Sequence, residues 1–262
     1  MLPPALPALA VDGLGLQIGG ARILQDVSFA VAPGEMVGVI GPNGAGKTTL
    51  FNLVSGVMRP TAGSVTLNGK EITNTPVHRR AKAGLGRTFQ TSNLFPRLSV
   101  LENVRLAAQA KLGGSLSVLR FPSGSDEATR IARGTIDEVG LTGKLTTAAG
   151  DLSHGEKRKV EIAVLLATDP AVVLLDEPMA GVASGDVPSL TAIIRGMHRD
   201  RGCTVMMVEH HMDVVLGLVD RVAVMHHGSL LALDSPDAVM ADPTVQSAYL
   251  GVTAGESAGD AA

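Results

Sequence analysis

The chain has 262 residues, enough for one large domain or for a domain with a subdomain. Its formal net charge of −3 gives no basic surface of the kind that nucleic-acid-binding proteins need, so we expect no nucleic-acid partner. Cys203 is the only cysteine, which excludes an internal disulfide and favours a reducing compartment. No apolar run reaches the length of a membrane span, so the chain is not expected to cross a membrane by itself.

The first part of the chain predicts antiparallel β-structure. Residues 27–31 alternate between apolar and polar or small side chains, as in a strand with one buried face. The apolar segment 65–67 ends at Asn68-Gly69, a dipeptide that favours a tight hairpin turn.

A glycine-rich loop follows the apolar run 36–40, which is typical of a buried strand, and residues 49–55 predict a helix. The loop fits the phosphate-loop pattern G-x-x-x-x-G-K-[ST] at every fixed position, and such loops point backbone N–H groups at phosphate oxygens. We therefore predict a nucleoside triphosphate site, with Lys47 on the β- and γ-phosphates and the Thr48 hydroxyl on Mg²⁺. The residues expected to bind the nucleotide are Gly41, Pro42, Asn43, Gly44, Ala45, Gly46, Lys47, Thr48 and Thr49.

Residues 95–151 have a different pattern, which predicts a helical insertion. Ser99-x-x-Glu102 predicts a capping box, and residues 126–139 predict a helix that ends at Gly140. Near the end of the chain, Ser235-Pro236 predicts a helix that runs to about residue 250.

Two further buried strands are predicted, at 171–175 and 204–208, and they end in Asp176-Glu177 and Glu209-His210. Because ligands of open α/β sheets bind beyond the carboxyl ends of the strands, we expect the phosphate loop, the acidic pair and His210 at one edge. Asp176 is predicted to hold Mg²⁺, and Glu177 to orient or deprotonate the attacking water. An acidic pair that only begins a helix before Pro178 is the alternative, and the phosphate loop upstream favours the catalytic interpretation.

The segment Leu152-Ser153-His154-Gly155-Glu156 begins another predicted helix, with a capping box at Ser153 and Glu156. A capped helix is one interpretation of this segment, and an anion site at the helix start is another. With this segment the chain resembles the ATP-binding cassette (ABC) ATPases, whose signature is close to Leu-Ser-Gly-Gly-Gln. The order of elements also matches: phosphate loop, glutamine, signature, acidic strand end, histidine.

The resemblance implies an α/β fold: a P-loop (RecA-like) core with a mixed sheet, an N-terminal antiparallel β subdomain and an inserted helical subdomain. It implies a single domain over 1–262, and the expected parts are a core at about 8–94 and 152–234, a helical subdomain at 95–151, C-terminal helices at 235–250 and a disordered tail at 251–262.

The resemblance also implies ATP and Mg²⁺ as ligands and a role for several residues. Gln90 occupies the position of the glutamine that senses Mg²⁺ and the γ-phosphate and relays to a transmembrane partner, and His210 that of the histidine that contacts the γ-phosphate. Two subunits would sandwich two ATP molecules, each between the Lys47 loop and the opposite subunit's Ser153, His154 and Gly155.

Two positions depart from the family pattern. Ile18 stands where the family usually has an aromatic ring that stacks on adenine, so we expect apolar contact with the base but no stacking. Ala183 stands where an aspartate is often found, in a loop that crosses the dimer interface in the family.

The subfamily that the chain most resembles is the ATP-binding subunits of branched-chain amino acid importers. Its marks are Gly86-Arg87-Thr88-Phe89-Gln90, the segment 94–104 and the ending 248–251, and importers of urea or amides share much of this pattern. The resemblance implies membrane permease subunits, a second ATPase subunit and, indirectly, a solute-binding protein, with the chain peripheral on the cytoplasmic face of the membrane. An exporter subunit, a non-transport ABC ATPase and a regulatory module that does not hydrolyse ATP are the alternatives.

Overall fold

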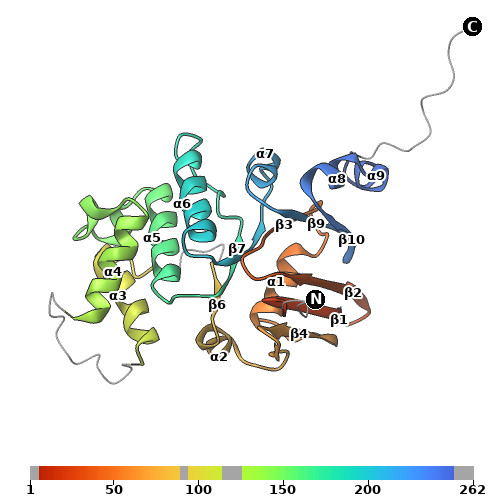
Figure 1. The fold of residues 1–262 in the computed structure, drawn as a ribbon, viewed down its shortest axis with the longest axis horizontal. Coiled ribbons are helices and arrows are strands. Elements are labelled where there is room, and N and C mark those ends of the chain that lie inside the picture. The colour runs from red at the N-terminus through yellow and green to blue at the C-terminus, as the bar shows by residue number, and fades with distance from the viewer. Residues whose placement is uncertain (1–5, 89–93, 114–125, 251–262) are drawn as a thin grey trace, which may run out of the picture.

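The computed structural model describes residues 6–88, 94–113 and 126–250, and these residues form two sheets surrounded by helices (Figure 1). The larger sheet has the order β10-β9-β3-β8-β7-β6, in which all neighbouring strands are parallel except β9 and β10. The smaller sheet is antiparallel, with the order β2-β1-β4-β5. The strands are β1 Leu9–Ile18, β2 Ala21–Val31, β3 Met36–Ile40, β4 Ala62–Leu67, β5 Lys70–Glu71, β6 Leu85–Arg87, β7 Val172–Asp176, β8 Thr204–Val208, β9 Arg221–His226 and β10 Ser229–Asp234.

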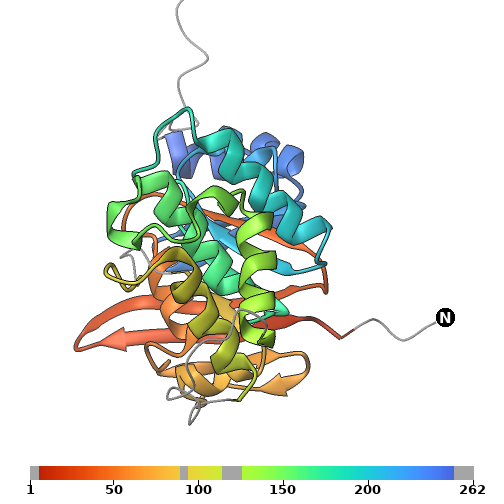
Figure 2. The same ribbon diagram turned by 90° about the vertical axis from the view of Figure 1, so that its left-hand side faces the viewer.

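The helices lie at both ends of the molecule and on both faces of the larger sheet. Figure 1 shows α3 and α4 at one end and α8 and α9 toward the other, and Figure 2 views the molecule from the side of α3 to α6. The α-helices are α1 Lys47–Ser55, α2 Val77–Lys82, α3 Val100–Lys111, α4 Glu127–Glu138, α5 His154–Leu166, α6 Val187–Arg199, α7 Met212–Leu216, α8 Pro236–Ala241 and α9 Pro243–Leu250, with 3₁₀ turns at Thr142–Lys144 and Ala149–Asp151.

Strand β7 shows how the sheet divides the core, because successive side chains of a strand point to opposite faces. Val173 and Leu175 pack in the cluster that includes α5 and α6, whereas Val172 and Leu174 pack in the cluster that includes α1 and the smaller sheet. All five residues of β7 are buried, as expected for a strand covered on both faces. The predicted α/β fold, with a mixed sheet and an antiparallel N-terminal part, is confirmed.

Several local predictions are confirmed at residue level. Leu67 pairs with Lys70 across Asn68-Gly69, and both turn residues have positive φ, 49° and 75°, as a type I′ hairpin requires. Helix α4 begins after Asp126, whose side chain accepts a hydrogen bond from the Thr129 N–H, and the chain reverses at Gly140 with φ of 71°.

Two local predictions were wrong in part. The Ser99 side chain caps α3, but the reciprocal half of the predicted capping box is replaced, since the Glu102 carboxylate binds Arg105. The single helix that Ser235-Pro236 predicted up to about residue 250 is two helices, in agreement with the C-terminal helices expected at 235–250. The chain breaks because the backbone is extended at Asp242, and Pro243, which lacks an N–H, begins α9. None of the helices in the described ranges is long and apolar enough to cross a membrane. The predicted tail 251–262 lies outside the described residues.

A buried arginine on α2 fixes the end of α1, the helix that begins at the phosphate loop. Arg80 is 2% exposed, and its guanidinium donates to the carbonyl oxygens of Leu53 and Val54 in the last turn of α1. It also donates to the carbonyls of Thr73 and Thr75. The positive side chain satisfies carbonyls that a helix end leaves without intrahelical partners.

We expect Arg80→Leu to lower the free energy of unfolding by about 3 kcal/mol, because several buried carbonyl groups lose a charged donor. Denaturant unfolding of the full chain measures this change. Arg79→Leu is the matched control, because the neighbouring Arg79 is exposed and should change stability by no more than about 0.5 kcal/mol. Equal losses for both variants would contradict the role of Arg80.

Candidate functional site

The phosphate loop joins β3 to α1, and two of its glycines have no room for a side chain. Gly41 has φ of 152°, and a Cβ there would lie 2.2 Å from the carbonyl oxygen of Met225. Gly46 has φ of 97°, and a Cβ there would lie 2.7 Å from Leu24 Cδ2. Gly46 is also the N-cap of α1 and supplies no capping side chain, so the first N–H groups of the helix are available to an anion.

Lys47 is buried beside this loop. Its Nζ donates to the carbonyl oxygens of Gly41 at 2.6 Å and Pro42 at 3.0 Å. Burial lowers the pKa of the Lys47 ammonium, and the negative charge of Glu177 opposes that shift. The other residues predicted for the loop present a mostly open face: Pro42, Asn43, Gly44 and Thr48 are exposed, Gly46 and Thr49 are half-buried, and Gly41 and Ala45 are buried.

Strands β7 and β8 place a carboxylate and an imidazole face to face beyond their carboxyl ends. Glu177 follows β7 and His210 follows shortly after β8, and His210 Nε2 lies 3.1 Å from Glu177 Oε1. The Glu177 side chain is 23% exposed and the His210 side chain 46%, so solvent reaches the pair. This geometry suits a carboxylate that orients or accepts a proton from water, next to a group that can donate a hydrogen bond.

Asp176, at the end of β7, is 1% exposed and forms an ion pair with Arg87. Its Oδ2 accepts from Arg87 at 2.8 Å, whereas its Oδ1 is buried and has no hydrogen-bond partner within the described part of the chain. The described residues hold no cluster of three acidic, histidine or cysteine side chains around a possible metal. One carboxylate oxygen without a partner fits Mg²⁺, which proteins bind with one or two carboxylates plus substrate phosphates.

Two positioning residues were missed by the sequence analysis. Arg158, on α5, donates to the carbonyl oxygens of Glu177 at 2.6 Å and Pro178 at 2.9 Å. Glu209 is 2% exposed and accepts from the Met179 N–H at 2.6 Å and from the His210 N–H at 3.1 Å. These bonds hold the turn in which Glu177 has a left-handed backbone, φ 49°. An arginine on the buried face of a predicted helix is the one local signal that could have indicated Arg158.

The Ser153 segment is not part of this edge. Ser153 is the N-cap of α5 and forms the predicted capping box with Glu156. Ser153 and His154 are exposed, and Gly155 packs so closely that a Cβ would lie 2.7 Å from Asp186 Oδ2. Helix α5 packs on the face of the sheet opposite α1, so the structure does not bring this segment into the layer of the phosphate loop.

The two remaining predicted site residues are Ile18 and Gln90, and the structure describes only Ile18. Ile18 is the last residue of β1, 54% exposed, and pairs with Ala21 across the Gly19-Gly20 turn. Gln90 lies outside the described residues.

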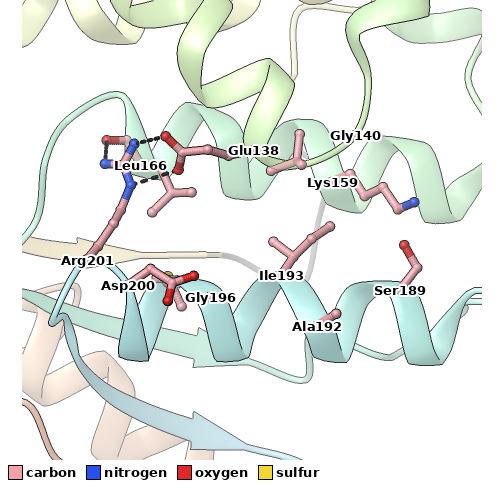
Figure 3. Close-up of a pocket in the computed structure, with 12 residues that line it drawn as sticks. Glu138, Gly140, Lys159, Leu166, Ser189, Ala192, Ile193, Gly196, Asp200 and Arg201 are labelled. Atoms are coloured by element: carbon pink, nitrogen blue, oxygen red, sulfur yellow. Dashed lines mark hydrogen bonds and ion pairs between the residues drawn. The ribbon is translucent and has the colours of Figure 1, made fainter.

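Two cavities lie away from the strand ends. One, of 260 Å³, is mainly apolar and lies among α1, α2, β6 and α5, with Val77, Arg87, Leu94 and Val164 in its wall. The other, of 770 Å³, lies among α4, α5 and α6 (Figure 3). At its end Arg201 forms a two-pronged ion pair with Glu138, at 2.7 and 2.8 Å.

The fold defines the class of the protein, which is a P-loop α/β protein with a RecA-like core. The family model described as ABC transporter matches residues 24–180. The chain is 36% identical over 250 residues to the high-affinity branched-chain amino acid transport ATP-binding protein BraF of Pseudomonas aeruginosa, covering 94% of this chain and 98% of that protein. It is 38% identical over 230 residues to the lipopolysaccharide export system ATP-binding protein LptB of Acidithiobacillus ferridurans, covering 87% and 90%.

The backbone matches a solved ATP-binding cassette of an ABC transporter, in its ADP conformation, with a TM-score of 0.82 at 30% identity. The match covers 94% of this chain and 99% of that one. The chain belongs to the ABC transporter family and is an ABC ATPase.

The lowered pKa of Lys47 predicts a pH dependence of ATP binding. A bound triphosphate stabilises the ammonium form and raises this pKa again, so ATP binding takes up a proton at pH values between the lowered pKa of the free protein and the raised pKa of the complex. Affinity should therefore fall as the pH rises through the lowered pKa, by at most about tenfold per pH unit. Equilibrium titrations at a series of pH values from about 8, above the last phosphate ionisation at about 6, up to 10.5 measure this fall in affinity.

Lys47→Arg is the control, because a guanidinium stays protonated throughout this range. Its affinity should be lower but flat with pH. If wild type and variant lose affinity in parallel, Lys47 is not the titrating group.

Proposed function

We propose that the chain is the ATP-hydrolysing subunit of an ABC importer that takes up a small solute, with branched-chain or related amino acids as the favoured class. The observation that carries the hydrolytic part is the pairing of Glu177 with His210 at the strand ends that also present Lys47. A binding module that does not hydrolyse ATP would need neither a carboxylate nor an imidazole at this place.

In the proposed mechanism the loop N–H groups and Lys47 bind the triphosphate, and Lys47 exchanges the carbonyls of Gly41 and Pro42 for phosphate oxygens. Glu177 orients the attacking water and accepts its proton, while His210 donates a hydrogen bond toward the γ-phosphate. Three groups would hold Mg²⁺: Asp176 Oδ1, the Thr48 hydroxyl and the Gln90 side chain. Bound Mg²⁺ supplies charge that offsets the negative charge of the phosphates.

A second ATPase subunit completes the site in this proposal. Within one chain Ser153, His154 and Gly155 lie at the start of α5, on the face of the sheet opposite α1. A second subunit in the opposite orientation could place its own α5 start over the ATP, where the helix N-terminus favours anions. Ile18 would give the adenine apolar contact without stacking, so we expect weak preference for one purine.

The direction of transport and the solute rest on resemblance. The relative named for branched-chain amino acid transport spans nearly the whole chain, which supports import. The 38% identity to a lipopolysaccharide export protein supports an exporter subunit as the second candidate. Identification of the membrane proteins that co-purify with the native subunit would separate the two, because permeases of solute importers support the first and lipid export components the second.

A membrane permease is the proposed partner, with the chain peripheral on the cytoplasmic face of the membrane and a solute-binding protein acting indirectly. The mainly apolar cavity beside β6 and α2 supports this surface as the docking site. Val77, in the wall of this cavity, is 40% exposed. The segment that continues from Leu94, another residue of the wall, also leaves large apolar side chains open to solvent, with Phe95 58% and Leu98 37% exposed.

Glu177→Gln should bind ATP with near wild-type affinity and hydrolyse it about 10²–10⁴-fold more slowly, because the amide cannot accept the proton from water. Single-turnover hydrolysis and equilibrium binding measure the two effects. Glu127→Gln is the control, since that carboxylate is exposed on α4, pairs with Arg130 and has no contact with the Glu177 turn. Hydrolysis by Glu177→Gln at the wild-type rate would show that this assignment is wrong.

Phe95→Glu should weaken binding to the permease by about thirtyfold, since loss of an aromatic anchor at an interface costs about 2 kcal/mol. ATP binding by the isolated chain should not change. Met240→Glu is the matched control, because Met240 is 46% exposed on α8, toward the other end of the molecule. Affinities for the reconstituted permease measure the effect, and equal affinities for the two variants would place the docking surface elsewhere.

A further inference from the structure

The guanidinium of Arg87 joins the acidic strand end to the helix that carries the phosphate loop. Arg87 is the last residue of β6, and its side chain is 6% exposed. One nitrogen donates to Asp176 Oδ2 at 2.8 Å, and another donates to Asn52 Oδ1 at 2.8 Å and Ser55 Oγ at 2.7 Å. Its central carbon lies 5.9 Å from the centre of the Phe51 ring. Three of these neighbours belong to α1, so the guanidinium fixes Asp176 relative to that helix.

The contacts of Asp176 fix the orientation of its second carboxylate oxygen, Oδ1. Oδ2 is held by Arg87, and the backbone N–H of Asp176 donates to Thr88 Oγ1 at 3.3 Å. A carboxylate held at one oxygen by a planar, rigid guanidinium cannot rotate freely. Oδ1 therefore keeps one orientation, buried and without a hydrogen-bond partner within the described ranges.

An Arg87–Asp176 ion pair that served stability alone would not be expected to leave Oδ1 without a partner among the described residues. A buried acceptor without a partner costs about 1–3 kcal/mol. Asp176 Oδ1 lies at the carboxyl end of β7, the sheet edge at which the charges of Lys47 and Glu177 attract each other. The arrangement fits a carboxylate that is held ready for a cation bound with the nucleotide.

We propose that Arg87 is a positioning residue for this cation. By tying Asp176 to Asn52 and Ser55, Arg87 aims Oδ1 at the Mg²⁺ that accompanies ATP, and it sets how much Mg²⁺ adds to ATP binding. The inference rests on the proposed function of the strand-end site. Arg87 contacts neither ATP nor Mg²⁺ in this proposal and acts through Asp176.

The test compares ATP affinity with Mg²⁺ and with EDTA, by equilibrium titration of the full chain. Arg87→Lys keeps the charge but replaces the rigid guanidinium, which binds Asp176 and α1 through two separate nitrogens, by a single flexible ammonium nitrogen. Its affinity in EDTA should stay within about twofold of wild type, whereas its affinity with Mg²⁺ should fall about tenfold, or 1.4 kcal/mol. Asn52→Ala removes one anchor on α1 and leaves the Asp176 ion pair, so its affinity with Mg²⁺ should fall about threefold.

Arg201→Lys is the matched control, because Arg201 also forms a two-pronged contact, with Glu138, at the end of a cavity away from the strand ends (Figure 3). It should change neither affinity.

Three results would overturn the proposal. Equal losses with Mg²⁺ and with EDTA for Arg87→Lys would mean an effect on the phosphate loop. If Mg²⁺ raised the ATP affinity of both Arg87→Lys and Asn52→Ala by the same factor as in wild type, Arg87 would have a purely structural role. Wild-type protein that binds no ATP in either condition would overturn the proposed function, and this inference with it.

Discussion

The parallel pairing of β3, β8 and β7 is the constraint on which the rest of the structure depends. Parallel strands end at one edge, so the phosphate loop, the His210 turn and the Asp176-Glu177 pair are brought together although they are far apart in the chain. The same sheet separates its two faces. Helix α1 packs on one face and α5 on the other, so one chain holds the phosphate loop and the Ser153 segment in different layers.

Buried charged side chains fix the positions of the groups at this edge of the sheet. Arg80 fixes the end of α1, Arg158 and Glu209 hold the turn around Glu177, and Arg87 ties Asp176 to α1. The buried ion pair of Arg87 with Asp176 contributes little net stability, because desolvation offsets the attraction, so its value is in orienting the carboxylate. The backbone at Glu177 is left-handed, a conformation that persists only where neighbouring bonds hold it.

The sequence was sufficient for the parts of the fold that depend on local pattern. The runs at β3, β7 and β8, the Asn68-Gly69 turn and the phosphate loop each have a short signature, and each was predicted within a residue or two. The positioning residues have none, because their partners are distant: Arg87 and Asp176 are 89 residues apart, and Arg80 and Leu53 are 27 apart. Glu102 shows the opposite error, since a matching local pattern was overridden by the nearby Arg105.

The central claim is that the site at the carboxyl ends of β3, β7 and β8 hydrolyses ATP only when a second subunit supplies its Ser153 segment. Mixing two inactive variants, Lys47→Ala and Ser153→Arg, tests it most directly. A mixed dimer would combine an intact loop from one chain with an intact segment from the other, so the mixture should recover about a quarter of wild-type ATPase activity if dimers form at random. A mixture as inactive as either variant, under conditions in which the wild type is active, would contradict the account.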